Sequence, residues 1–575
     1  MSGKNNKYPS SMYHERNEKL LHRHPLIPSI GYFSALKAMS LSFRSAPAVD
    51  CLKLRVSYQE LINDAAMISK ALQELGVKKG DIISISLTNT YHAIATFCAG
   101  NSIGAVVTFL NPQSTIEQEI SYLNTFESPL FVHMDKGQKY NDKISSSTKV
   151  KYIINLRPND VESRDFNSQK NTGYHKYVSF NELNSIASNR KKADICFVSG
   201  KDDALILFTS GTTGIPKSVV ITNENLLASG IYMKNSCYRA IIKEAKTLVC
   251  VPFSYPYGFC TSALMSLLCG WEVILAPVLN GDNIKDYYAK GPTYVFGSPA
   301  FLELTKRYVP KDQVLSKTKV FISGGDFLFD KEIKEAHEFF QAHHANVAIC
   351  NGSGNAESVG ASTNAVGVPH KPGTVGRVLT GTHPIVIDQE TAEELPYGAE
   401  GELCISGKHV FKEYYNEKEL TKEIKFLYQG REYIHTGMMG TLDEEGYFTI
   451  TGRASRFYIN SDLNKIYLER VQNIISLIGG VESCIAVPKP DDEKLFTCKA
   501  YIVPVKGIAV DDSFKTYLKS QFYKPLTDTH GEEVQLKPYE IPESFELIEK
   551  LPRSAGKGDK IDIALLEEMA RKTNY

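Results

Sequence analysis

The sequence has no excess of charge of either sign. Its 575 residues include 65 Lys and Arg and 65 Asp and Glu, so the formal net charge at pH 7 is zero. A neutral chain gives no electrostatic reason to expect nucleic acid or an anionic membrane surface as a partner. The remaining composition, 42% apolar and 23% charged, is that of an ordinary soluble globular protein.

Cysteine pairing motifs are absent as well. The 11 cysteines are an odd number, and no two of them form a CxxC pair. This pattern favours free thiols in a reducing compartment over a disulfide framework.

Long uninterrupted apolar runs are also missing. The two longest runs, residues 93–110 and 263–279, are broken by Asn101 and Glu272, so we interpret them as buried helix and strand and expect no membrane span. Residues 1–19 are polar and lack the apolar core of a signal peptide. We therefore expect a cytoplasmic protein.

The length exceeds the size at which single cores stop growing, so we expect at least two domains. After an irregular lead-in of about 30 residues, Ser57 and Glu60 form a capping box before a helix that Gly76 ends. Strands and helices then alternate, which implies βαβ units and a parallel sheet. The expected strands are residues 82–87, 105–112, 130–133, 150–156, 204–208, 247–251, 272–277, 294–297, 319–323 and 346–350.

The pattern changes after residue 372. Short strands separated by Gly- and Asp-rich turns predict a β subdomain that extends to about residue 452. A mixed α+β stretch follows and ends in an expected helix at residues 561–571.

One loop carries an unusual concentration of Gly, Thr and Ser. The apolar strand DALILF, residues 203–208, leads directly into TSGTTGIPKS and then VVIT, which predicts a loop or tight hairpin between two strands. Gly211 and Gly214 permit positive φ, so successive N–H groups can form an anion-binding nest to which hydroxyls and Lys217 add donors and charge. Pro216 precedes the Lys where a Walker-type loop needs Gly. The residues alone leave three hypotheses open: the loop binds a phosphate, binds another chain, or is a plain surface turn.

The string TSGTTGIPKS, residues 209–218, resembles the phosphate-binding loop of the adenylate-forming enzymes: acyl-CoA synthetases, adenylation domains and beetle luciferase. Other motifs similar to those of the family follow in its order. They are SGGD at 323–326, NGSGNAE at 351–357, GELCISG at 401–407, YIHTGMMGTLDEEGY at 433–447, GRAS at 452–455 and LPRSAGK at 551–557. The resemblance covers roughly residues 57–566.

The resemblance implies an α/β fold with two domains. A large N-terminal α/β domain, residues 1–454, would include the β subdomain at about 372–452. A small, mobile C-terminal α+β lid, residues 455–575, would rotate about a hinge near Ser455. The family joins a carboxylic acid to ATP as an acyl-adenylate, and many members then form a thioester with coenzyme A.

The resemblance also implies roles for individual residues. Lys557 would bridge the acid and the α-phosphate, Lys217 would hold phosphates, and Glu357 would hold Mg²⁺, so these are the candidate catalytic residues. The candidate nucleotide-binding residues are Thr209, Ser210, Gly211, Thr212, Thr213, Gly214, Gly324, Gly325, Asp326, Asn351, Gly352, Ser353, Met438 and Arg453. The candidate acyl pocket consists of Ser254, Tyr255, Tyr257 and Gly258, and it suits an aryl or medium acyl acid unless these aromatics belong to the core. The implied cofactors are ATP, Mg²⁺ and coenzyme A, and the implied partner is a small carboxylic acid.

Two features leave alternatives open. Lys560, in a segment similar to the family's GKIDRxALLE, competes with Lys557 for the role of the catalytic lysine. The sequence also departs from the family pattern at five positions: Ser218, Ser353, Ala356, Met438 and Asp462. Met438 replaces a ribose-binding Asp. Asp462 lies where the family has a Gly that lines the path of the incoming thiol's pantetheine arm. We favour an active acid–thiol ligase. The alternatives are a ligase that uses an amine or a carrier protein as acceptor, and a nucleotide- or acyl-binding paralogue without activity.

Overall fold

The computed structural model describes the chain except for a set of short segments. The described residues are 8–10, 25–164, 176–190, 194, 196–209, 217–237, 242, 244–325, 328, 330–367, 371, 373–453, 456–461, 465–491, 493–527, 533–553 and 561–572.

The N-terminal region contains two large sheets rather than the single parallel sheet that the alternation suggested. One runs in the order β19-β9-β8-β4-β3-β5-β6-β7, and the other in the order β14-β13-β12-β10-β11-β1-β2. The first contains β3 (Ile82–Ser86), β4 (Val106–Phe109), β5 (Leu130–Met134), β6 (Tyr152–Leu156), β7 (Tyr177–Ser179), β8 (Asp203–Phe208), β9 (Ser218–Thr222) and β19 (Glu413–Tyr414). The second contains β1 (Pro47–Cys51), β2 (Leu54–Ser57), β10 (Lys246–Val249), β11 (Glu272–Leu275), β12 (Tyr294–Gly297), β13 (Val320–Ser323) and β14 (Ala348–Asn351).

Most neighbouring strands in both sheets are parallel, as predicted. The exceptions are the β1–β2, β8–β9 and β9–β19 pairs, which are antiparallel. The helices of this region are α2 (Tyr32–Met39), α3 (Tyr58–Glu74), α4 (Tyr91–Ser102), α5 (Ile116–Thr125), α6 (Gln138–Ser147), α7 (Leu183–Ser188), α8 (Asn223–Ser236), α9 (Met265–Leu268), α10 (Ile284–Ala289), α11 (Pro299–Tyr308) and α12 (Asp330–Ala342), with a π-helix at Tyr257–Leu264.

Local signals in the sequence agree with the element boundaries. The Ser57 hydroxyl accepts from the Glu60 N–H and the Glu60 carboxylate accepts from the Ser57 N–H, so the predicted capping box begins α3. Gly76 follows the helix with φ of 84°, a conformation that glycine adopts without steric cost. Both predicted boundaries are confirmed.

The β subdomain and the C-terminal α+β domain have separate sheets. In the subdomain the order is β17-β18-β21-β20, with β22 paired to β21. Its elements are β15 (Thr363–Asn364), β16 (Arg377–Val378), β17 (His383–Ile387), β18 (Glu400–Ser406), α13 (Lys418–Ile424), β20 (Lys425–Tyr428), β21 (Arg431–Leu442) and β22 (Phe448–Arg453). The C-terminal elements are β23 (Phe457–Ile459), β24 (Lys465–Tyr467), α14 (Leu468–Ser476), β25 (Val481–Asp491), β26 (Leu495–Pro504), α15 (Asp512–Gln521), β27 (Leu526–Thr527), β28 (Glu533–Val534), β29 (Ser544–Leu547) and α16 (Ile563–Lys572).

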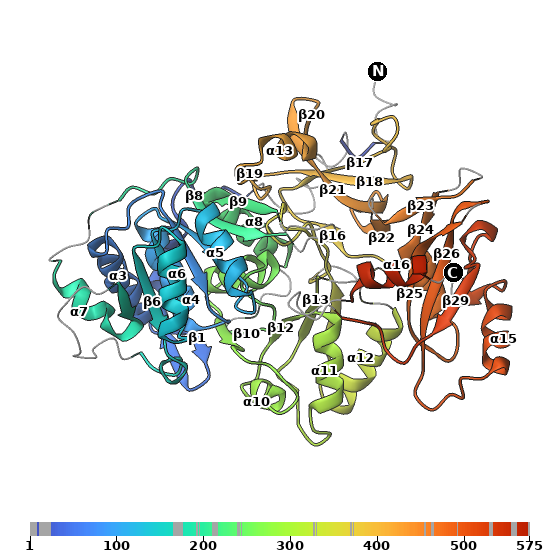
Figure 1. Ribbon diagram of the computed structural model, residues 1–575, viewed down its shortest axis with the longest axis horizontal. Helices are drawn as coiled ribbons and strands as arrows, with labels where there is room; N and C mark the ends of the chain where they lie inside the picture. Colours follow the sequence, from blue (N-terminus) through green and yellow to red (C-terminus); the bar gives the residue numbers. More distant parts are fainter. Residues whose placement is uncertain are drawn as a thin grey trace.

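The three regions lie beside one another in Figure 1. The first sheet and its helices, in blue to green, lie on the left; the β subdomain, in yellow and orange, lies above; and the C-terminal strands and helices lie on the right. The C-terminal domain has an apolar core of its own, built around residues such as Val471, Ile475, Ala486 and Ile502. The predicted fold class is therefore confirmed, while the boundary at residue 454 stays a prediction.

The cysteines and the apolar helices agree with the sequence predictions. Each of the 11 cysteines, all of which lie in the described residues, is a free thiol. Among the helices of the described residues, none has both the length and the apolarity that crossing a membrane requires.

Candidate active site

The two strands that flank the Gly/Thr-rich segment pair with each other, which agrees with the predicted loop or tight hairpin between two strands. β8 and β9 are antiparallel, with Phe208 opposite Ser218. At the base of the loop, the Thr209 N–H donates to the Lys217 carbonyl at 2.9 Å, and the Lys217 N–H donates to Thr209 Oγ1 at 3.1 Å. Thr209 therefore closes the base of the loop with both its backbone and its side chain. Residues 210–216, and with them Ser210, Gly211, Thr212, Thr213 and Gly214, lie outside the described residues.

Lys217 and Glu357 meet at a residue that the sequence analysis missed, Tyr414. The Lys217 ammonium nitrogen lies 5.1 Å from the centre of the Tyr414 ring, within range of a cation–π interaction. The Tyr414 hydroxyl donates to Glu357 Oε1 at 2.5 Å. Tyr414 is 1% exposed and Glu357 is 7% exposed. Two candidate catalytic residues thus contact the same buried side chain: Lys217 contacts the face of the Tyr414 ring, and Glu357 contacts its hydroxyl.

The position of Tyr414 depends on a long-range strand pair. β19 adds to the edge of β9 with Tyr414 opposite Val219, and the Tyr415 N–H donates to the Ser218 carbonyl at 2.8 Å. Burial, followed by the neighbouring Glu357 carboxylate, raises the pKa of Tyr414, so the hydroxyl stays protonated and donates at neutral pH. The aromatic pair Tyr414–Tyr415 in a polar stretch is the only sequence signal that could have pointed to it.

The loop that carries Glu357 is held by short hydrogen bonds. Asn355 Oδ1 accepts from the Ser358 N–H at 2.8 Å, and the Glu357 carbonyl accepts from the Phe411 N–H at 2.8 Å. The Asn355 side-chain amide donates to the Thr436 carbonyl of β21 at 3.3 Å. These bonds join the Glu357 loop to the β subdomain.

Residues 323–326 resemble the family's adenine-contacting turn, and we call them the adenine-side turn. This turn begins at the end of β13, and Asn351 and Gly352 lie at the end of the neighbouring parallel strand β14. Gly324 comes after β13 and its N–H donates to the Gly297 carbonyl at 3.1 Å; the Gly352 N–H, after β14, donates to the Ser323 carbonyl at 3.0 Å. Asn351 at the end of β14 donates from its side chain to the Leu328 carbonyl at 2.9 Å. The structure therefore brings together Gly324, Gly325, Asn351 and Gly352, whereas Asp326 lies outside the described residues.

Two departures from the family pattern contact each other. The Ser353 hydroxyl donates to Met438 Sδ at 2.6 Å, and Met438 is 8% exposed. Met438 lies opposite Leu403 in β18 on one side and opposite Arg453 in β22 on the other. Arg453 is exposed at the end of β22. A thioether thus occupies the place where the family pattern has a carboxylate.

The candidate acyl residues adjoin the adenine-side turn. Tyr257 begins the π-helix, and its hydroxyl donates to the carbonyls of Ile322 at 2.8 Å and Gly297 at 3.2 Å. A Cβ at Gly324 would lie 2.9 Å from the Tyr257 ring, so the ring packs against this glycine. Ser254 is buried and its hydroxyl has no hydrogen-bond partner among the described residues. Burial also raises the pKa of Tyr255.

The family of the chain follows from its sequence as a whole. The sequence profile named AMP-binding enzyme matches residues 40–415. The chain belongs to the AMP-binding enzyme family. It is 25% identical to a long-chain-fatty-acid–CoA ligase of Bacillus subtilis (strain 168), over 98% of this chain and 97% of that protein. It is 24% identical to a D-alanine–D-alanyl carrier protein ligase of Streptococcus pneumoniae (strain ATCC 700669 / Spain 23F-1), over 92% of this chain and 96% of that protein.

A solved structure of similar fold supports the fold assignment. The ATP-bound structure of MatB from Rhodopseudomonas palustris is 22% identical, with a TM-score of 0.79 over 95% of this chain and 100% of that chain. The resemblance that the motifs indicated is therefore confirmed at the level of family and fold. The roles of individual residues, including those of Ser455, Asp462, Lys557 and Lys560 outside the described residues, stay predictions.

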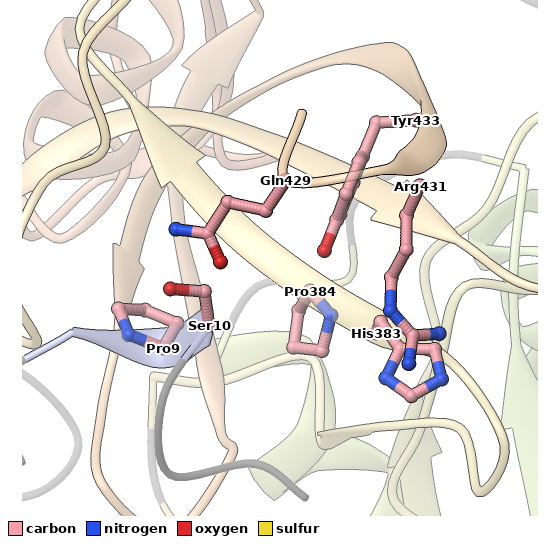
Figure 2. A pocket seen from close by; sticks show the side chains of 7 residues that line it. All are labelled: Pro9, Ser10, His383, Pro384, Gln429, Arg431 and Tyr433. Carbon is pink, nitrogen blue, oxygen red and sulfur yellow. The ribbon is translucent and has the colours of Figure 1, made fainter. Parts of the chain in front are cut away.

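This AMP-binding enzyme also has a surface pocket that shares no residue with the candidate site. Figure 2 shows Pro9 and Ser10 of the N-terminal segment against β17 and the β20–β21 hairpin. The pocket has a volume of about 100 Å³ and is lined by Pro9, Ser10, His383, Pro384, Gln429, Arg431 and Tyr433. Ser10 is held there by the Glu394 carboxylate, which accepts from its N–H at 2.8 Å and from its hydroxyl at 2.7 Å. The pocket is too small for a nucleotide and is separate from the predicted reaction site.

Proposed function

We propose that the chain is an ATP-dependent acid–thiol ligase that forms an acyl-adenylate from a small carboxylic acid and then a thioester with coenzyme A. The observation that carries the proposal is the meeting of Lys217 and Glu357 at Tyr414, beside the base of the hairpin. Family membership supports the same reaction class.

The charges at this site suit the first half-reaction. An attacking carboxylate and the α-phosphate repel each other, so catalysis needs cations and fixed donors where charge develops. Lys217 supplies a cation at the base of the loop, held over the Tyr414 ring, and Arg453 supplies another at the end of β22. By resemblance Lys557 adds a third from the lid.

Glu357 fits the role of a Mg²⁺ ligand. Its carboxylate is nearly buried, and within the described residues Tyr414 is the hydrogen-bond donor to it. Because that donor is a neutral hydroxyl rather than a cation, it does not compete with a hard cation that prefers oxygen ligands. When bound, Mg²⁺ would neutralise charge on the phosphate oxygens. Tyr414 would fix the direction in which Glu357 points.

The acid is proposed to bind beside Tyr255 and Tyr257. Because the Tyr257 ring packs on Gly324, the acyl residues and the adenine-side turn share a wall. An aryl or medium acyl acid suits aromatic side chains with the Ser254 hydroxyl nearby. We also infer a cytoplasmic location, since 11 free thiols suit a reducing compartment.

ATP–pyrophosphate exchange tests the adenylation step. The full chain is assayed with a panel of aryl and medium-chain acids, and coenzyme A is then added to detect the thioester. We expect exchange with at least one acid, loss of exchange in Lys217→Ala, and normal exchange in Lys422→Ala, which removes an exposed lysine of α13. Measurable ATP binding without exchange for any acid would instead favour the paralogue that has lost its chemistry.

A second candidate acceptor is the thiol of a carrier protein, or an amine. Asp462 stands where the family pattern has a Gly on the thiol path, and one relative is named a D-alanyl carrier protein ligase. Once the acid is known, single-turnover transfer from the adenylate to coenzyme A, to a pantetheinylated carrier domain and to a simple amine can be compared. Faster transfer to the carrier or the amine than to coenzyme A would select this alternative.

A further inference from the structure

Three side chains with metal-binding atoms share one face of the β subdomain sheet. Glu402 and Cys404 are two residues apart on β18, so they point to the same face. His435 on β21 is the direct cross-strand partner of Cys404. The register shifts between Leu403 and Cys404, because β21 accommodates two additional residues between His435 and Met438. This bulge aligns the imidazole with the thiol and the carboxylate.

The donor atoms of the three side chains are close together. Glu402 Oε2 lies 3.1 Å from His435 Nδ1, and Cys404 Sγ lies 3.8 Å from the same nitrogen. All three donor atoms lie within 4.8 Å of one another. Tetrahedral Zn²⁺ with usual bond lengths would separate its sulfur and nitrogen ligands by about 3.6 Å and its nitrogen and oxygen ligands by about 3.3 Å. Small side-chain adjustments would therefore bring these atoms to a coordination geometry.

We propose that Glu402, Cys404 and His435 bind one Zn²⁺ ion, with water as the fourth ligand. A carboxylate, a thiolate and a neutral imidazole would compensate the two positive charges of the ion, and a site without net charge is the least costly to bury. A thiolate–imidazole–carboxylate set favours Zn²⁺ over Mg²⁺ or Ca²⁺, which take oxygen ligands. The site is therefore distinct from the proposed Mg²⁺ site at Glu357.

The burial of the ligands indicates how the ion would enter. Cys404 is fully buried and Glu402 is 5% exposed, while the His435 side chain is 36% exposed. A cysteine binds a metal as the thiolate, whereas a free cysteine thiol carries its proton at neutral pH. Formation of the S–Zn bond therefore breaks the S–H bond and releases one proton to solvent for each ion bound.

The surrounding residues orient the ligands. Glu402 Oε1 accepts from the Gly437 N–H at 2.9 Å, which leaves Oε2 toward His435, and the Gln389 side-chain amide lies 3.4 Å from Oε2. The Phe426 ring packs on the His435 ring with centres 4.6 Å apart. On the other side Cys404 belongs to an apolar cluster with Ile385, Ile387 and Tyr433. A hydrogen bond between His435 and Glu402 would by itself explain why the carboxylate lies beside His435 Nδ1. It would not explain why the buried Cys404 thiol lies beside the same nitrogen.

Cobalt titration tests the site directly. The full-length protein, reduced with a phosphine and stripped with a chelator, is titrated with Co²⁺ while absorbance and proton release are recorded. We expect one equivalent to produce a thiolate-to-cobalt charge-transfer band in the near ultraviolet, one released proton, and loss of the band when Zn²⁺ is added. Absence of the band at stoichiometric Co²⁺ would overturn the proposal and leave a hydrogen-bonded triad only.

Three variants separate this site from the other thiols. Cys404→Ser should abolish the band, and His435→Gln, which alters a half-exposed residue and preserves the core, should weaken Co²⁺ binding about a hundredfold or more. Cys196→Ser removes a half-buried thiol elsewhere and should leave the band and affinity unchanged. Thermal melts check that each variant is folded. A band that survives in both Cys404→Ser and His435→Gln would show that other cysteines bind the ion and would also overturn the proposal.

Discussion

The Ser353 hydroxyl donates a hydrogen bond to Sδ of Met438, although the two residues are 85 positions apart in the chain. Both are departures from the family pattern, and the fold brings them into direct contact. The half-buried Ser353 hydroxyl thus has the thioether sulfur of the buried Met438 as its acceptor.

Met438→Asp is expected to restore a ribose contact. The new carboxylate can accept from the Ser353 hydroxyl and from ribose, and a hydrogen bond to a charged group contributes about 1.5–3 kcal/mol, or roughly ten- to a hundredfold in affinity. ATP should therefore bind more tightly to the variant, while 2′,3′-dideoxy-ATP, which has neither ribose hydroxyl, should bind about as before. Calorimetric titration measures both, with Met438→Leu as the control of similar size. Equal gains for the two nucleotides would contradict a ribose contact at this position.

Tyr414→Phe is expected to weaken the function of Glu357. The ring and its contact with Lys217 stay, but Glu357 Oε1 loses its buried donor. We expect the Mg²⁺ concentration needed for half-maximal exchange to rise about tenfold, which corresponds to about 1.4 kcal/mol. Tyr414→Leu removes the ring as well and should also raise the KM for ATP. An unchanged Mg²⁺ requirement in Tyr414→Phe, in a variant that is folded by thermal melt, would argue against Glu357 as the Mg²⁺ ligand.

Gly258→Ala is expected to disturb the candidate acyl segment. A Cβ at Gly258 would lie 2.4 Å from the carbonyl oxygens of Val251 and Pro252, which are backbone atoms and cannot rotate away. Overpacking of this kind destabilises a fold by about 1–3 kcal/mol. Chemical denaturation should show this loss, whereas in Gly352→Ala the Cβ has its nearest neighbour at 3.6 Å and should cost less. Equal stability of the two variants would mean that the start of the π-helix adjusts freely.

The free energy of unfolding is expected to decrease as the pH is lowered, in part because buried histidines resist protonation. Burial lowers the pKa of His409 from 6.5 to about 4, so the unfolded state takes up a proton between these pH values while the folded state does not. The contribution of His409 to the free energy of unfolding is therefore fully present above pH 6.5. It decreases as the pH falls toward 4, by up to about 3 kcal/mol. Burial lowers the pKa of His92 and His133 in the same way.

The variant His409→Gln isolates this contribution. Its unfolding free energy, measured by denaturant titration from pH 7 to pH 4, should depend less on pH than that of the wild type. His344→Asn alters an exposed side chain and should retain the wild-type dependence. A parallel pH profile for His409→Gln and the wild type would show that His409 is not the source.

The choice of catalytic lysine can be tested by substitution, although both candidates lie outside the described residues. Because Gly556 precedes Lys557 as in the family motif, Lys557→Ala should abolish adenylate formation while Lys560→Ala leaves it intact. Pyrophosphate exchange measures both variants against the wild type. The reverse outcome would move the assignment to Lys560.

The sequence by itself determined the features that depend on a few consecutive residues. The capping box of Ser57 and Glu60, the glycine turn after α3 and the strand–loop–strand order around Lys217 involve partners at most a dozen or so residues apart. Such interactions are local, so residue type and spacing are enough to predict them. The order of motifs along the chain was likewise sufficient to indicate the family.

Only the tertiary structure decided which distant residues meet. The alternation of strands and helices could not show that they form two sheets, because strand order depends on pairing across the chain. Tyr414 contacts Lys217 only because β19 pairs with β9, and Cys404 meets His435 only because of the bulge in β21. The residues next to Tyr414 and Cys404 in the sequence do not indicate which distant residues they contact, because these contacts arise from long-range strand pairing.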